Sequence, residues 1–237
     1  MQKKLIVWAA LCAAAIAVVV APTAGASAPT QCWGVLSGTV NGNVVVPDGK
    51  WCILAGTQVH GNVTVGTGAW LHSVAGAGGS TTTIDGNVNG TDVQWVLLQY
   101  NTQVGGNFMI DGARSGYTGF DINVDVAGNA TITGNAGYTF VDAAIVGRNV
   151  DVEGATGGVE VEWNRVGGNE TVSNNVPAAL SVYGNQVDGN LAVNDNTGAG
   201  HKQVIQNSAA RNLTCLGNDS PFVSSANAAK SIQGQCS

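Results

Sequence analysis

The sequence is poor in charge and in proline. Of its 237 residues only 10% are Asp, Glu, Lys or Arg, and only five are proline. The nine basic residues are outnumbered by 15 acidic ones, which argues against binding to nucleic acid, because such binding requires a basic face. No CxxC pair occurs, and His60, His72 and His201 are scattered, so neither a zinc site nor a nucleophile relay can be assembled from them.

No apolar run long enough to cross a bilayer occurs after the first 20 residues. Lys3 and Lys4 precede the apolar stretch in these residues, and the small-residue run AGASA follows at 24–28, which is the pattern of a secretory signal peptide. We expect residues 1–26 to be removed after Ala26, the alternative being an uncleaved anchor. Residues 27–237 then hold seven basic and 15 acidic residues, a net charge of −8. The expected location is extracellular, without membrane association once the signal is removed.

Glycine and asparagine are abundant, and they recur together in one sequence motif, seen in VHGNVTV, VGGNFMI, VAGNATI, VGGNETV and VDGNLAV. The Asn positions are spaced by 19 to 25 residues, mostly by 20 to 22. A period near 21 is typical of a solenoid, in which each repeat is one coil that cannot bury its apolar face alone. The nine positions are Asn43, Asn62, Asn87, Asn107, Asn129, Asn149, Asn169, Asn190 and Asn212.

The residues after each Asn alternate between apolar and variable side chains, which predicts a strand. A coil of this length has no room for a helix in addition to several strands. We interpret the Asn residues as structural, because Asn tolerates left-handed backbone and can pass hydrogen bonds to the Asn of the next coil. A second column is Asn101, Asn123, Asn164, Asn185 and Asn207, with Ala144 in its empty slot, and a looser third set is Asn135, Asn175, Asn196 and Asn218.

This repeat resembles that of right-handed parallel β-helices, namely bactofilin-type and pectin-lyase-like solenoids and small secreted bacterial β-helix proteins. The resemblance covers about residues 35 to 218 and implies an all-β, single-stranded right-handed parallel β-helix of about 8–9 coils. We expect one domain over residues 27–237, with caps at about 27–39 and 219–237. The resemblance concerns the repeat and not an active site, so it implies a fold more than a function.

Four cysteines lie beyond the signal, as pairs separated by 20 and 21 residues. In a coil of that length each pair falls in one column on adjacent coils, about 4.8 Å apart, which a disulfide can bridge. We predict Cys32–Cys52 and Cys215–Cys236, each contributing on the order of 3 kcal/mol. Disulfides at both ends favour a monomer over a polymer, because open solenoid ends recruit further strands.

One outward column places carboxylates on successive coils, just before the second Asn column. Stacked like charges raise one another's pKa or recruit a cation such as calcium, and paired acids serve polysaccharide hydrolases and lyases. We favour a solvated acidic face, because Arg148 and Arg165, the nearest bases for a lyase, fall outside the column. No catalytic residue or metal ligand is assigned. The candidates for catalysis or calcium are Asp121, Asp142 and Glu162, and those for binding are Glu160, Tyr183 and Gln99.

Two further features bear on this reading. Trp51, Trp70, Trp95 and Trp163 could stack on sugars, although at this spacing we favour an edge or cap position. Glu170 conflicts with the pattern, because the alternation places this charged residue at a core-facing position. Either the register of the strand shifts there, or Arg148 forms an ion pair with Glu170.

We therefore expect a secreted, non-enzymatic β-solenoid without a cofactor, acting as a structural or surface-interaction protein such as an adhesin, a spacer or a saccharide binder. Its expected partner is a cell-wall or extracellular polysaccharide or a surface protein. Two alternatives stay open: a polysaccharide lyase or hydrolase of pectin-lyase-like type that uses the acidic column, and a subunit that polymerises end to end.

Overall fold

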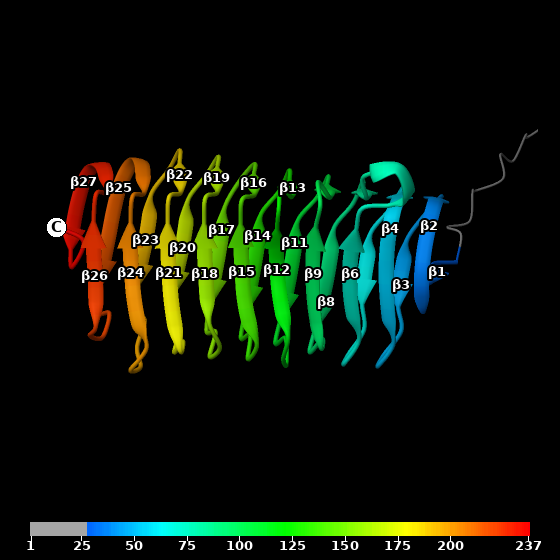
Figure 1. Ribbon diagram of the computed structural model, residues 1–237, viewed down its shortest axis with the longest axis horizontal. Helices are drawn as coiled ribbons and strands as arrows, with labels where there is room; N and C mark the ends of the chain where they lie inside the picture. The colour runs from blue at the N-terminus through cyan, green and yellow to red at the C-terminus, as the bar shows by residue number, and fades with distance from the viewer. Residues whose placement is uncertain (1–27) are drawn as a thin grey trace, which may run out of the picture.

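The computed structural model describes residues 28–237, which form a parallel β-solenoid of about ten coils (Figure 1). The predicted signal peptide lies outside the described residues. Within them the only helical element is a 3-10 turn, η1 (Ala77–Gly79). None of the helical structure in this part of the chain is long and apolar enough to cross a membrane. The prediction of an all-β parallel solenoid is confirmed.

Each coil visits three parallel sheets, A, B and C, in that order. Sheet A contains β1 (Thr30–Gln31), β3 (Val44–Val46), β5 (Val63–Val65), β8 (Val88–Thr91), β11 (Phe108–Asp111), β14 (Ala130–Thr133), β17 (Val150–Glu153), β20 (Glu170–Ser173) and β23 (Leu191–Asn194). Sheet B contains β6 (Trp70–Val74), β9 (Trp95–Gln99), β12 (Tyr117–Asp121), β15 (Tyr138–Asp142), β18 (Val159–Glu162), β21 (Ala179–Tyr183), β24 (His201–Ile205) and β26 (Phe222–Ser225).

Sheet C is narrow, and its strands have two residues each in most coils. They are β7 (Thr83–Ile84), β10 (Gln103–Val104), β13 (Asp125–Val126), β16 (Ile145–Val146), β19 (Arg165–Val166) and β22 (Gln186–Val187). Four longer strands continue through a corner of the coil. β2 (Gly34–Val40) and β4 (Trp51–Val59) join sheets B and C, whereas β25 (Ser208–Leu216) and β27 (Ala228–Gly234) join sheets C and A.

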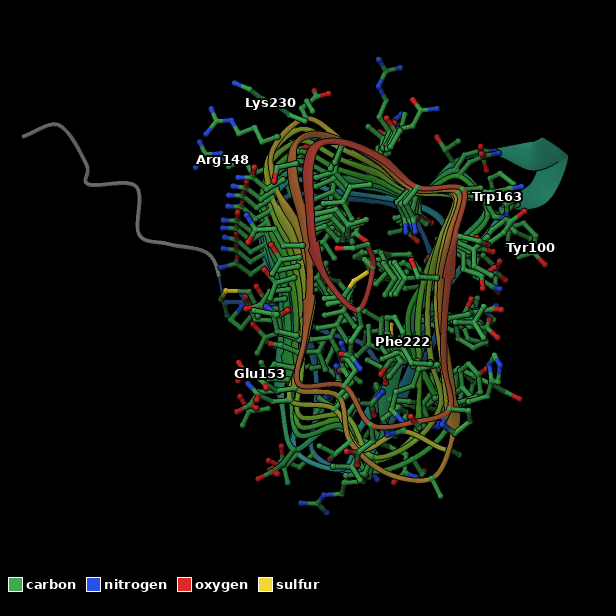
Figure 2. The ribbon with its side chains drawn as sticks, turned by 90° about the vertical axis from the view of Figure 1, so that its left-hand side faces the viewer. Tyr100, Arg148, Glu153, Trp163, Phe222 and Lys230 are labelled. Carbon is green, nitrogen blue, oxygen red and sulfur yellow. A yellow bond between two sulfur atoms is a disulfide. The ribbon has the colours of Figure 1, made fainter. Side chains whose placement is uncertain are left out.

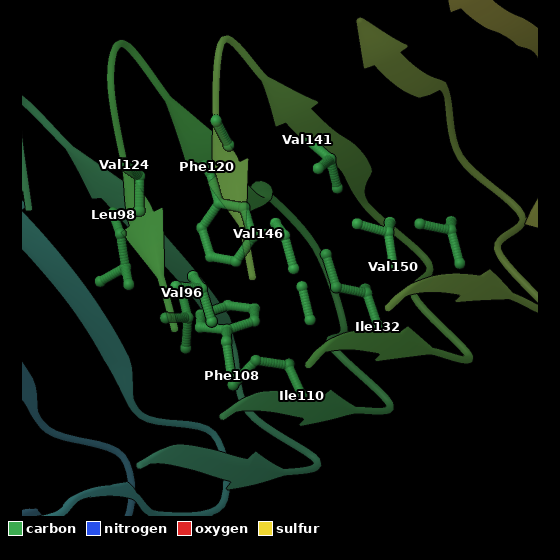
Figure 3. Close-up of a cluster of buried hydrophobic side chains, with 14 of the residues drawn as sticks. Val96, Leu98, Phe108, Ile110, Phe120, Val124, Ile132, Val141, Val146 and Val150 are labelled. Carbon is green, nitrogen blue, oxygen red and sulfur yellow. The ribbon is translucent and has the colours of Figure 1, made fainter. Parts of the chain in front are cut away.

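The core lies between sheets A and B, because alternate residues of both sheets point inward. Phe108 from sheet A meets Phe120 from sheet B edge to face, with ring centroids 4.5 Å apart, and Leu98 and Ile110 pack in the same layer (Figure 3). Both Phe side chains are fully buried, and each such side chain contributes about 1.5–3 kcal/mol. The apolar positions of the repeat therefore form one continuous core along the axis.

The nine repeated Asn residues form a hydrogen-bonded ladder where the chain enters sheet A, as predicted. In each step the backbone N–H and the side-chain amide of one Asn donate to Oδ1 of the Asn one coil nearer the N-terminus. Asn149, for example, donates to Asn129 at 3.2 and 3.0 Å. The ladder runs through Asn43, Asn62, Asn87, Asn107, Asn129, Asn149, Asn169, Asn190 and Asn212.

Two buried ladders run in the opposite direction, each Asn donating toward the C-terminus. Asn164, Asn185 and Asn207 form one between sheets B and C, and it extends to Asn227. Asn175, Asn196 and Asn218 form the other between sheets A and B. Each side-chain amide also donates to a backbone carbonyl of the preceding coil, such as Asn185 Nδ2 to Val161 O at 2.7 Å. These ladders satisfy backbone groups at turns that the core would otherwise leave unpaired.

The assignment of Asn101 and Asn123 to the second column is wrong. Both side chains are exposed, and the inward position in their coils belongs to Thr102 and Val124. The turn holds one extra residue in these coils, because two consecutive residues adopt positive φ, such as Tyr100 and Asn101, where later coils have only one.

Glu170 lies inside the core without a change of register. It pairs with Val150 on one side and Leu191 on the other, its side chain is 0% exposed, and neither carboxyl oxygen has a hydrogen-bond partner in the described residues. Arg148 is exposed and forms no ion pair with it. Both explanations from the sequence, a slipped coil and pairing with Arg148, are therefore wrong. Burial raises the pKa of the Glu170 carboxyl to about 8.

Both predicted disulfides are present, one near each end. Cys32–Cys52 has a Cα–Cα distance of 5.5 Å and Cys215–Cys236 one of 5.3 Å, and each joins adjacent coils. The ranges expected to be caps contain further strands, β1 and β2 at one end and β26 and β27 at the other. The repeat therefore continues beyond residues 40–218 in both directions.

Candidate functional face

The outward side of sheet B, which we call face B, carries three columns of side chains, one residue per coil. The first is aromatic, the second is mixed, and the third contains the carboxylates. The first column is Trp51, Trp70, Trp95, Tyr117 and Tyr138; the second is Ile53, His72, Leu97, Gly119, Phe140, Glu160 and Ser181; the third is Gln99, Asp121, Asp142, Glu162 and Tyr183. The structure thus brings all six candidate residues onto one face.

The carboxylates of the third column lie side by side. Asp121 accepts a hydrogen bond from Gln99 Nε2 at 2.6 Å, and Asp142 is paired in register with Glu162. Asp142 Oδ1 is buried and has no hydrogen-bond partner in the described residues. Partial burial, followed by repulsion from Glu162 and Asp121, raises the pKa of Asp142. The carboxylates of this column therefore repel one another.

The two other binding candidates are engaged by neighbours. Glu160 Oε1 accepts a hydrogen bond from the Tyr138 hydroxyl at 2.6 Å, and burial together with this carboxylate raises the pKa of Tyr138 to about 12. Tyr183 donates to Gln206 and meets the Trp163 ring edge to face at 4.8 Å. These contacts hold the two side chains in fixed positions on the face.

No Lys or Arg of the described residues forms an ion pair with these carboxylates. Arg165 is exposed on β19 in sheet C, and Arg148 lies across the coil from Trp163 (Figure 2). Between residues 28 and 237 the only ion pair joins His60 to Asp85, at 2.7 Å. In the same range no three His, Cys, Asp or Glu side chains are grouped so that they could hold a metal ion. None of the described bases is thus placed for a lyase reaction at this column, and calcium binding stays an alternative hypothesis.

The tryptophans form a stack within face B. The rings of Trp51 and Trp70 lie 5.4 Å apart and those of Trp70 and Trp95 lie 4.7 Å apart, with interplanar angles of 16° and 11°. Trp51, Trp70 and Trp95 are the first residues of β4, β6 and β9, at the edge of sheet B, whereas Trp163 lies on an exposed turn. Because the ring faces cover one another, the stack offers ring edges rather than a flat platform for a ligand.

A hollow at Gly119 was not predicted from the sequence. Gly119 has φ +132, and a Cβ on it would lie 1.6 Å from the carbonyl oxygen of Phe140. The backbones of β12 and β15 therefore approach closely at this point. Beside it the face contains a hollow of about 310 Å³, lined by Leu97, Gln99, Tyr117, Asp121 and Phe140. The glycine inside the strand sequence YTGFD was the available signal, since such a glycine marks a close backbone approach.

A chain of hydrogen bonds fixes the polar side of this hollow. His72 Nε2 lies 2.7 Å from Gln99 Oε1, and Gln99 Nε2 donates to Asp121 Oδ2. Because Gln99 uses its amide to donate to Asp121, its oxygen accepts from the N–H at Nε2 of His72, which assigns the tautomer of this ring. This series of hydrogen bonds occupies Oδ2 of Asp121, so Oδ1 can accept a hydrogen bond from another donor.

No family model matches the chain, and neither a curated protein nor a solved structure matches it significantly. The fold places it in the class of parallel β-solenoids. The more specific resemblances, to bactofilin-type and pectin-lyase-like solenoids, are not supported.

Asp142→Asn is expected to leave the free energy of unfolding unchanged or to raise it by up to about 1 kcal/mol, because it removes repulsion between neighbouring carboxylates. The melting temperature, measured with chelator and with calcium, tests this. Asp151→Asn is the matched control, since Asp151 is partly buried beside Glu153 on sheet A and its pKa is also raised. A calcium-dependent rise in the parental melting temperature, lost in Asp142→Asn and kept in Asp151→Asn, would contradict the solvated-face interpretation.

Proposed function

We propose that the protein is an extracellular, non-catalytic solenoid that binds saccharide through face B. The observation that supports this most is the column of Asp121, Asp142 and Glu162 beside aromatic side chains on one rigid sheet. Carboxylates accept hydrogen bonds from sugar hydroxyls, and aromatic rings pack against the apolar side of a sugar ring. The predicted signal peptide and the two disulfides support an extracellular location.

The non-catalytic assignment depends on the surroundings of the carboxylates. A polysaccharide lyase needs a base above the same cleft, and no Lys or Arg of the described chain forms an ion pair with the column. The alternative of a polymer-forming subunit is less favoured, because a disulfide ties the end of the chain to the neighbouring coil on both sides.

Co-sedimentation with insoluble polysaccharides tests the proposal, using cellulose, chitin, chitosan, pectate and peptidoglycan. We expect the mature protein to be retained by at least one of them and to release no unsaturated product. Tyr117→Ala should weaken retention, because Tyr117 is exposed on face B, whereas Met109→Ala should not, because Met109 is similarly exposed on sheet A. Retention by none of the polysaccharides would refute saccharide binding, and release of unsaturated product would favour the lyase.

A further inference from the structure

We infer that the hollow at Gly119 is a subsite for an amino sugar, which places its ammonium group against Asp121 and packs its ring against Tyr117 and Phe140. This inference rests on the proposed saccharide binding and adds the chemical class of the sugar residue.

The shape of the hollow fits one ring. Its volume of about 310 Å³ is at the lower end of the range for ligand pockets, so it accommodates a single residue and not a larger group. Its apolar side is formed by two aromatic rings in contact with each other, Tyr117 and Phe140, whose centroids lie 5.4 Å apart at an angle of 47°. A sugar ring can pack against this pair, but not between its members. Only glycine fits at position 119 beside the hollow, because a Cβ there would collide with the carbonyl oxygen of Phe140.

The charge around the hollow selects a cation. Asp121 lines it, Asp142 and Glu162 follow on the next two coils, and no Lys or Arg within residues 28–237 forms an ion pair with them. An ammonium group is attracted both by these carboxylates and by the faces of the aromatic rings. Burial and, after it, repulsion from Glu162 and Asp121 raise the pKa of Asp142, and a bound cation would relieve the repulsion.

The spacing of the coils favours a sugar chain over a peptide with lysine side chains. Equivalent positions on face B recur at about 4.8 Å, whereas an extended peptide rises about 3.3 Å per residue, so its side chains fall out of step with the coils. A pyranose residue in an extended chain has nearly the length of one coil step. Successive sugar residues can therefore meet successive coils, with the hollow taking one of them.

Isothermal titration calorimetry with a glucosamine oligomer tests the inference, at mildly acidic pH where the amines are protonated. The matched ligands are the N-acetylated oligomer of the same length and a lysine oligopeptide. We expect the glucosamine oligomer to bind most tightly and its affinity to fall with added salt. Asp121→Asn should weaken it by at least about tenfold, whereas the matched control Asp151→Asn on sheet A should leave it unchanged.

Three outcomes would overturn the inference. Equal binding of the N-acetylated oligomer would show that the ammonium group is not recognised, although saccharide binding itself would stand. Tighter binding of the lysine oligopeptide would identify a protein partner instead. An affinity that Asp121→Asn leaves unchanged would place the ligand elsewhere. Failure of the proposed function is distinguished from these outcomes, because then no polysaccharide retains the protein in the sedimentation assay.

Discussion

Replacing Glu170 with leucine is expected to stabilise the protein, and by a larger amount at about pH 8 than at about pH 4.5. The carboxyl group is fully buried between Val150 and Leu191, and its oxygens have no hydrogen-bond partner in the described residues. An unsatisfied buried polar group costs about 1–3 kcal/mol even when it is neutral. Leucine matches the apolar neighbours in the column and removes this cost at every pH.

The pH dependence follows from the raised pKa. The carboxyl has a pKa of about 8 when folded and 4.5 otherwise, so between these values the native state holds a proton that the unfolded state releases. The native state's preference for this proton stabilises the fold fully below pH 4.5. This part of the free energy of unfolding is lost as the pH rises toward 8, by about 1.4 kcal/mol per pH unit. Glu170→Leu should therefore gain several kcal/mol more over the parent at the upper end of this window than at the lower end.

Chemical denaturation of parent and variants across this pH window measures the effect. Glu170→Gln separates charge from polarity, because glutamine does not titrate but leaves a buried polar group; it should remove the pH dependence and gain little at low pH. Glu153→Leu is the control for an exposed carboxylate on the same sheet and should change stability only slightly. A Glu170→Leu protein no more stable than the parent at the alkaline end would refute the assignment of a buried, unpaired carboxyl.

The second large effect is expected for Asn185→Ala, with a loss of about 3 kcal/mol. The Asn185 side chain donates to Val161 O at 2.7 Å and to Asn207 Oδ1 at 3.1 Å, and its own Oδ1 accepts two bonds from Asn164. Alanine removes all four bonds and leaves buried backbone groups unpaired, which costs more than the bonds alone.

The matched control is Asn149→Ala in the outer ladder. Asn149 takes part in the same kind of ladder, but it is exposed, so water replaces the lost partners and the expected cost is at most about 1 kcal/mol. Equilibrium unfolding in denaturant compares the two variants. Equal losses in both would contradict the conclusion that burial, and not the ladder pattern itself, decides the contribution of an Asn.

The fold could be predicted from the sequence because the same pattern of residues recurs in every coil of the solenoid. The interval between Asn residues gives the coil length, and that length alone aligns Cys32 with Cys52 and Asp121 with Asp142. Positions one coil apart in the sequence become neighbours in space, so a column read from the repeat is a row of contacts in the molecule.

The sequence-based predictions failed where one coil differs in length from the others, or where a feature occurs in a single coil and is not repeated. The turn at Tyr100–Asn101 is one residue longer than in later coils, so the inward position moves by one residue. The number of residues between an Asn and the preceding strand does not show that the turn is longer. The alternation placed Glu170 inward correctly, but it cannot show whether a buried carboxyl finds a partner. The hollow at Gly119 depends on side chains from three coils, Leu97, Tyr117 and Phe140, and became visible only with the register of sheet B.

The two disulfides also determine how the solenoid carries a mechanical load, as an adhesin or spacer would have to. Coils are linked in series along the axis, so a pull on the chain ends would peel them off one at a time. Cys32–Cys52 and Cys215–Cys236 divert such a force past the first and last coils. The load then enters at Cys52 and Cys215, both fully buried in the core, and the residues between each pair of cysteines bear none of it.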